Sequence, residues 1–168
     1  MNKQSIFFTI LVGVISLLLA LGLIQFLAQK TFKLNPHEKP SWSFLIWQST
    51  WLIPFFIFLN SALEITENTI ETVIYSNTVQ NTFLYSTGKI LLYIGFTFLF
   101  TLFVNKIVDV IDNFFFSKNN TSIELENNNV VYFTFKLVLV VGLAFSLLTV
   151  FEHFLSWFVP SIETPFYH

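Results

Sequence analysis

The stretch SIFFTILVGVISLLLALGLIQFL, residues 5–27, contains no charged side chain. The hydrocarbon core of a bilayer is about 30 Å thick and an α-helix rises about 1.5 Å per residue, so roughly 20 uncharged residues are needed to cross it. The stretch meets this requirement. A cleaved signal peptide is the alternative because Lys3 precedes the apolar run, but the run is too long for one and no small-x-small cleavage pattern follows it. We therefore expect an uncleaved membrane-spanning helix.

Three further apolar stretches are long enough to cross a bilayer, at about residues 41–63, 86–107 and 130–152, and the first of these is also uncharged. Together with the first span at about residues 5–27 they predict an all-α fold, an integral membrane four-helix transmembrane bundle. We expect one transmembrane domain over residues 1–168. The ends of the third span are the least sharply defined by the sequence.

The composition agrees with a membrane protein and argues against nucleic acid as a partner. Charged residues make up 11% of the chain, against about a quarter in a soluble domain, and hydrophobic residues make up 54%. Eight Lys and no Arg supply the positive charge, so no basic face exists that could neutralise a run of phosphates. Abundant Asn, Phe, Ile and Lys with little Gly, Pro and Ala indicate a bacterial protein, which the spans place in the inner (plasma) membrane.

The residues that commonly carry chemistry in membrane bundles are missing or misplaced. Cysteine is absent, which removes thiolate metal sites and cysteine nucleophiles. His37, His153 and His168 lie at span ends or in loops, whereas haem and di-iron sites need His residues that face one another within spans. No phosphate loop, catalytic triad or HExxH pattern occurs. We predict no catalytic, cofactor-binding or metal-binding residues, and a protein that is not an enzyme.

Pro54 lies near the middle of the second span. Proline cannot donate a hydrogen bond to the carbonyl of Thr50 four residues earlier, and it kinks the helix. The hydroxyls of Ser49 and Thr50, or a neighbouring helix, are expected to replace that bond in part. The kink is either a hinge or cavity with a function or a tolerated defect, and we favour the defect.

An acidic stripe follows the second span. Glu64, Glu67 and Glu71 fall within about 60° of one another on a helix of 3.6 residues per turn. Carboxyl groups at this spacing can hold a divalent cation or a basic partner. Like charges this close are more typical of a solvated face, which we favour.

Lys136 lies about two turns inside the fourth span, and an intramembrane lysine is a functional-site hypothesis by default. The alternative is snorkelling, because Lys136 and Glu152 are separated by about 24 Å along a helix and can reach opposite faces of the hydrocarbon layer. We favour snorkelling. Beyond the third span, Asp109 and Asp112 belong to an amphipathic continuation that is expected to lie along the membrane surface.

The distribution of lysines predicts an orientation. An even number of spans places both termini on one side of the membrane, and positively charged loops are retained in the cytoplasm. Two lysines, Lys3 and Lys89, lie on the terminal side. Five lysines lie in the two loops of the other side: Lys30, Lys33, Lys39, Lys106 and Lys118. We therefore predict that both termini are periplasmic or extracellular.

Each half of the chain consists of a span, a Lys-bearing polar loop and a second span. This pattern is that of two repeated helical hairpins that enter the membrane in the same orientation, as in a parallel repeat. Any four-span protein with basic inner loops gives the same outline. Duplication and coincidence therefore explain it equally well.

The segment IELENNNVV, which opens the fourth span, combines acids with asparagines. Asn127 to Asn129 can cap the first turn of the helix, and Glu124 and Glu126 lie near the positive end of its dipole. We favour helix capping over a ligand site. Residues 104–147 resemble bacterial small membrane proteins of the domain-of-unknown-function 350 family, with Glu124 or Glu126 in the acidic position, Asn128 or Asn129 in the asparagine position, and Gly142 and Ala144 as the small residues of the span. The resemblance implies a four-span fold without an established activity.

Three function classes remain. The favoured one is a non-catalytic membrane subunit or scaffold that assembles with protein partners, or with further copies of itself, in a bacterial envelope complex. An oligomeric pore or small transporter is the alternative, with the kinked second span and Lys136 lining its path. An intramembrane enzyme is disfavoured because no nucleophile accompanied by a base is recognisable. The lipid bilayer is the expected surrounding in every case.

Overall fold

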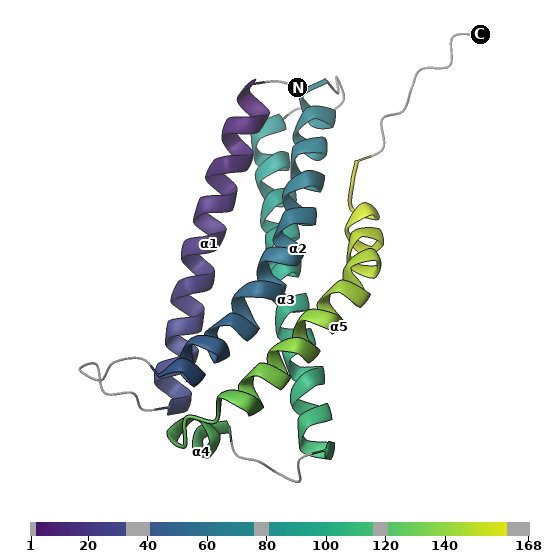
Figure 1. Cartoon of the computed structure of the whole chain (residues 1–168). Helices are drawn as coiled ribbons and strands as arrows, with labels where there is room; N and C mark the ends of the chain where they lie inside the picture. The colour runs from purple at the N-terminus through teal and green to yellow at the C-terminus, as the bar shows by residue number, and fades with distance from the viewer. Residues whose placement is uncertain (1–2, 33–40, 76–80, 116–120, 161–168) are drawn as a thin grey trace.

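The computed structural model describes residues 3–32, 41–75, 81–115 and 121–160, and within these ranges all regular structure is helical. Figure 1 shows four long helices and one short one. Their bounds are α1 Lys3–Phe32, α2 Trp42–Tyr75, α3 Thr82–Phe115, α4 Thr121–Glu126 and α5 Val130–Ser156. The long helices α1, α2, α3 and α5 are apolar and long enough to cross a membrane. The predicted all-α fold with four spans is confirmed.

The long helices alternate in direction (Figure 1). We call the end of the bundle where α1 and α3 stop and α2 and α5 start the loop end, and the opposite end the terminal end. Helix α2 is central and packs against α1, α3 and α5, with its most extensive contacts to α3 and α5. The bundle is therefore organised around α2.

Helices α2 and α3 continue past the spans that the sequence predicts, to Tyr75 and Phe115. The continuation of α2 is held because Thr66, Thr69 and Val73 remain buried on one face. The continuation of α3 likewise buries one face in the bundle. It does not form a separate helix along the membrane surface, which corrects the expectation from its amphipathic pattern.

Aromatic rings close the centre of the bundle between α2, α3 and α5. The ring centroids of Phe58 and Phe151 are 4.9 Å apart, and Phe100 lies 4.9 Å from Phe151 and 5.8 Å from Phe58. Val140 and Ala144 of α5 are fully buried beside them. Packing of this kind, rather than hydrophobic transfer from water, holds helices together in a bilayer.

The carbonyl left free by Pro54 is satisfied by another helix. The Asn105 side chain on α3 donates through Nδ2 to the Thr50 carbonyl at 3.2 Å, while the hydroxyls of Ser49 and Thr50 donate to other carbonyls of α2. Pro54 is itself buried, and Figure 1 shows the axis of α2 changing direction along its length. The sequence leaves two donors open for this carbonyl, the nearby hydroxyls of α2 or a neighbouring helix. The structure shows that the neighbouring helix is the donor.

The two helical hairpins are not arranged as symmetric copies. A two-fold axis along the membrane normal would relate α1 to α3 and α2 to α5, so α1 would pack against α5 as α2 packs against α3. The contact between α2 and α3 is extensive, whereas α1 and α5 have no comparable contact. Duplication of the hairpin stays a prediction that the helix arrangement does not support.

Candidate functional site

Polar side chains enter the apolar bundle near both ends of α5. Toward the loop end, ionisable side chains of α3 and α5 meet in what we call the charge cluster, formed by Lys106, Asp109, Asp112, Tyr132 and Lys136. Toward the terminal end, α2 and α5 line a pocket, described below. The two sites differ in whether their charges are compensated.

Lys136 is buried in the charge cluster. Its Nζ lies 2.6 Å from Asp109 Oδ1 and 3.7 Å from Asp112 Oδ2, and its side chain is 5% exposed. The hydroxyl of Tyr132 donates to Asp112 Oδ2 at 2.9 Å. The sequence favours snorkelling of Lys136 to the membrane surface, but the structure instead pairs it with two carboxyl groups, because Asp109 and Asp112 share the face of α3 that packs against α5.

The charge cluster is electrically balanced. Lys106, on the exposed side of α3, lies 3.8 Å from Asp109 Oδ2, so two lysines accompany two aspartates. Removing a charge from water is costly unless it is paired and hydrogen-bonded. The charged groups of the cluster are paired in this way. One exception is Asp112 Oδ1, a buried oxygen that has no hydrogen-bond partner in the described part of the chain. The charge cluster therefore joins α3 to α5 through ion pairs and a hydrogen bond.

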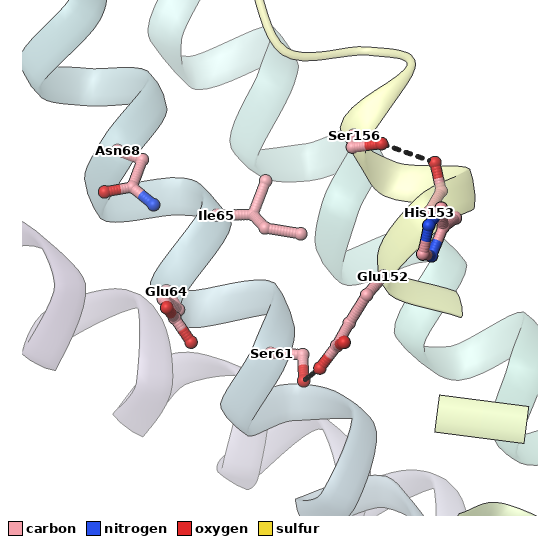
Figure 2. Close-up of a pocket in the computed structure, with 7 residues that line it drawn as sticks. All are labelled: Ser61, Glu64, Ile65, Asn68, Glu152, His153 and Ser156. Carbon is pink, nitrogen blue, oxygen red and sulfur yellow. Dashed lines mark hydrogen bonds between the residues drawn. The ribbon is translucent and has the colours of Figure 1, made fainter. Parts of the chain in front are cut away.

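The pocket between α2 and α5 has a volume of about 380 Å³ (Figure 2). It is lined by Ser61, Glu64, Ile65, Asn68, Glu152, His153 and Ser156, and we call it the α2–α5 pocket. At its floor the Ser61 hydroxyl donates to Glu152 Oε1 at 2.8 Å, joining the two helices. Two carboxyl groups, two hydroxyls, an amide and an imidazole therefore line one cavity.

In the described part of the chain, no lysine forms an ion pair with the carboxyl groups of the α2–α5 pocket. Among the described residues the lysine ion pairs lie in the charge cluster, and Lys89 donates to the Phe158 carbonyl at 2.8 Å. Glu152 has the hydroxyl of Ser61 as its hydrogen-bond donor, and Glu64 is exposed. The pocket therefore contains two carboxyl groups and, among the described residues, no lysine.

The α2–α5 pocket lies at the level of the apolar part of α1. Leu63, next to Glu64, faces Gly13 of α1, where an added Cβ would lie 3.4 Å from Leu63 Cδ1. From Gly13 the candidate membrane-spanning part of α1 continues to Ile6, about two helical turns or roughly 10 Å farther toward the terminal end. Glu64 therefore lies at the level of an apolar part of α1.

The three glutamates of the acidic stripe are separated by the fold. Glu64 lines the α2–α5 pocket, whereas Glu67 and Glu71 do not. Glu67 is partly buried, and its Oε1 is a buried atom without a hydrogen-bond partner in the described part of the chain. Glu71 is also partly buried. Since two of the three are partly buried, the stripe differs from the fully solvated face that the sequence favours.

The asparagine-rich segment is a capping structure, as predicted. Asn129 is the N-cap of α5: its Oδ1 accepts from the Tyr132 N–H at 3.1 Å, and its Nδ2 donates to Glu124 Oε2 at 2.7 Å. Asn128 has a φ of 50°, in the left-handed region that asparagine tolerates. Its Oδ1 accepts from the Ser43 N–H at 3.2 Å, so it also binds the first turn of α2. Glu126 is exposed on α4.

The sequence did not identify several residues of the two sites. Asp109 and Asp112 were assigned to a surface helix, although their spacing of three and the spacing of four between Tyr132 and Lys136 are the signal of two facing polar patches. Ser61 lies near the end of the second predicted span and Glu152 at the end of the fourth, and 91 residues separate them. A single sequence contains no signal that two positions so far apart are in contact. Within the described residues no group of three His or acidic side chains is placed to hold a metal ion.

Comparison with known proteins adds no relative. The chain matches no protein-family model, no curated protein and no solved structure. The resemblance of residues 104–147 to the domain-of-unknown-function 350 family therefore stays a prediction. Function has to be argued from the two polar sites.

Proposed function

We propose that the protein is a non-catalytic integral membrane subunit that assembles with partner proteins in the bacterial inner membrane. The observation that supports this most is the α2–α5 pocket, which holds Glu64 and Glu152 on two candidate membrane-spanning helices without a lysine from the described part of the chain. Polar and ionisable groups within membrane-spanning helices usually mark a contact or a pathway. A partner supplies the missing contacts.

The packing of the core favours assembly over transport through a single copy. Between the α2–α5 pocket and the charge cluster, the rings of Phe58, Phe100 and Phe151 are in contact. They separate the two polar regions by an apolar layer. Lys136, which would have to line a pore, is occupied by Asp109.

The same geometry disfavours an enzyme. The Ser61 hydroxyl donates to Glu152, the Ser156 hydroxyl donates to the His153 carbonyl at 2.6 Å, and a ring nitrogen of His153 lies 2.8 Å from the Thr149 carbonyl. The imidazole and the hydroxyls of the pocket are thus bonded to other groups. They are not aligned as a nucleophile and its base.

Purification in a mild detergent tests the assembly. The full chain with an affinity tag is extracted from the native membrane, and co-purifying proteins are identified by mass spectrometry against an untagged strain. We expect at least one integral membrane protein to accompany the chain at a fixed ratio through size-exclusion chromatography. A chain that elutes alone, as monomer or as homo-oligomer, contradicts the proposal.

A further inference from the structure

We infer that the bilayer meets the bundle at two levels, which lie about 30 Å apart along the helices. The loop-end level is marked by the charge cluster, and the terminal-end level by Lys89 of α3 with Trp157 at the end of α5. Between the two levels the outer faces of α1, α3 and α5 fit acyl chains, and at each level the side chains fit lipid headgroups. The inference concerns a lipid surface and a single copy of the chain, so it goes beyond the proposed function.

Helix length alone does not fix the position of the bilayer. The candidate spans of α2 and α3 contain 32 and 34 residues, which is roughly 50 Å of helix against a hydrocarbon core of about 30 Å. Both helices therefore extend beyond the core. Trp, Tyr and Lys gather at its boundaries, because each combines an apolar body with a polar end.

The terminal-end level is formed by α3 and the end of α5. Lys89 Nζ donates to the Phe158 carbonyl at 2.8 Å, and the neighbouring Trp157 is exposed. The Tyr93 hydroxyl donates to the same carbonyl at 3.3 Å and lies 3.0 Å from the hydroxyl of Thr69 on α2. An ammonium and an exposed indole therefore lie at one level, which Tyr93 connects to α2.

The loop-end level is formed by the charge cluster and the end of α1. Lys106 extends from the cluster with an exposed side chain. Tyr132 of the cluster packs in one group of buried apolar side chains with Ala28 of α1. The exposed Lys30 of α1 therefore lies near the same level. Lysines of α1 and α3 thus face outward where the apolar layer ends.

The spacing of the two levels on α3 and α5 matches the hydrocarbon core. Lys136 and Trp157 are about 31 Å apart along α5, and Lys89 and Asp109 are about 30 Å apart along α3. Between Lys89 and Asp109 the sequence of α3 contains one charged residue, Lys106, next to the loop-end level. The two joined helices therefore enclose one apolar layer of bilayer thickness.

Helix α1 fits the same layer. Gly13 faces Leu63 of α2, which lies about 9 Å from Thr69 along α2. Because α1 and α2 run in opposite directions, α1 reaches the terminal-end level near Phe7. The residues from Phe7 up to Lys30 carry no charge, and they form about 35 Å of helix. The uncharged length of α1 therefore covers the distance between the two levels.

Three acidic side chains fall between the two levels: Glu64 and Glu67 of α2 and Glu152 of α5. Along their helices they lie within about 8 Å of Thr69 or Trp157, the residues of the terminal-end level. A charge costs more at the centre of the bilayer than near the headgroups. All three acids therefore lie near the headgroups and away from the middle of the layer.

Depth measurements with spin labels test the inference. The chain contains no cysteine, so one introduced cysteine carries a nitroxide without background. Leu18 of α1, Leu99 of α3 and Phe145 of α5 are exposed and lie about midway between the two levels. The purified full-length protein with Leu18→Cys, Leu99→Cys or Phe145→Cys is reconstituted in phosphatidylcholine vesicles. Collisions of each label with oxygen, which concentrates in the hydrocarbon, are compared with collisions with a water-soluble nickel chelate.

We expect the label at Leu99 to be the deepest on α3. Labels at the exposed residues Leu91, about 12 Å toward the terminal end, and Val110, about 17 Å toward the loop end, should be shallower. A label at the exposed Phe83, beyond Lys89, should collide readily with the nickel chelate. A greater depth at Leu91 or at Val110 than at Leu99 overturns the inference.

The labels on the other helices provide a second criterion. Leu18 and Phe145 should lie at the same depth as Leu99, within about one helical turn, or about 5 Å. A larger difference shows that the three helices do not share the two levels and also overturns the inference. Circular dichroism of each labelled variant shows whether its helices remain intact.

A further pair of variants tests whether Lys89 and Trp157 mark the boundary. Lys89→Leu combined with Trp157→Leu should move the label at Phe83 toward the hydrocarbon, because the terminal end loses its polar anchors. Lys89→Arg combined with Trp157→Tyr keeps both kinds of anchor and should leave the label in place. An unchanged label in the double Leu variant contradicts the inference. These measurements use the protein without a partner, so their failure is distinct from a failure of co-purification.

Discussion

A single amide group on α3 replaces the backbone hydrogen bond that Pro54 removes from α2. Asn105 Nδ2 donates both to the Thr50 carbonyl and, at 3.0 Å, to the Thr101 carbonyl of its own helix. In lipid no water can satisfy a free carbonyl, so the neighbouring helix must. Asn105 therefore links the proline site of α2 to α3.

Asn105→Ala should destabilise the protein by about 1 kcal/mol, because the Thr50 carbonyl loses its donor. Unfolding by sodium dodecyl sulfate in mixed micelles measures the change. In a Pro54→Ala background, residue 54 regains an N–H for that carbonyl, and the same Asn105 substitution should cost less. Asn113→Ala, at an exposed position of the same helix, is the control. Additive effects of Pro54→Ala and Asn105→Ala would refute the link between the two residues.

At the scale of elements, the length of the apolar stretches predicts the four spans but not where two of the helices end. Mean apolarity falls after Leu63, yet α2 continues because Thr66, Thr69 and Val73 stay on its buried face. A hydropathy criterion does not register a helix that is apolar on one face and polar on the other. The cap at Asn129 was predictable because capping is local in sequence. The contacts between α3 and α5 and between α2 and α5 were not, because they depend on the packing.

Lys136→Met should weaken the contact between α3 and α5 strongly, by about 3–5 kcal/mol, because it leaves Asp112 buried without a cation. Asp109 contributes less to this cost, since its side chain is 36% exposed. The same detergent unfolding assay measures the loss. Adding Asp112→Asn should restore part of the stability. Lys106→Met, whose side chain is 76% exposed, is the matched control and should change stability little. A small effect of Lys136→Met would mean that the cluster does not hold the two helices.

At the scale of the whole molecule, the alternation of helix directions places the start of α1 and the end of α5 at the same end of the bundle (Figure 1). Which side of the membrane that end faces rests on the distribution of lysines. Lys33, Lys39 and Lys118, three of the five on the loop side, lie outside the described residues. The orientation in the membrane therefore stays a prediction from the distribution of lysines in the sequence.

A reporter enzyme that is active solely in the periplasm should be active when fused to the C-terminus, because the lysine-rich loops are expected to stay in the cytoplasm. The same reporter inserted between α1 and α2 should be inactive. A cytoplasmic fluorescent reporter at both positions gives the complementary readout. A silent C-terminal fusion with an active fusion between α1 and α2 would invert the orientation.

The pairing of Lys136 with Asp109 has a consequence for biosynthesis. The two residues are 27 positions apart, and a ribosome adds about 5–20 residues per second, so Lys136 is synthesised roughly 1–5 seconds after Asp109. Until then the aspartates of α3 have no partner from α5, and after that α5 brings a lysine that is costly to release alone into lipid. We therefore expect α3 and α5 to leave the insertion machinery together. The order in which the helices are synthesised then affects how the fold forms.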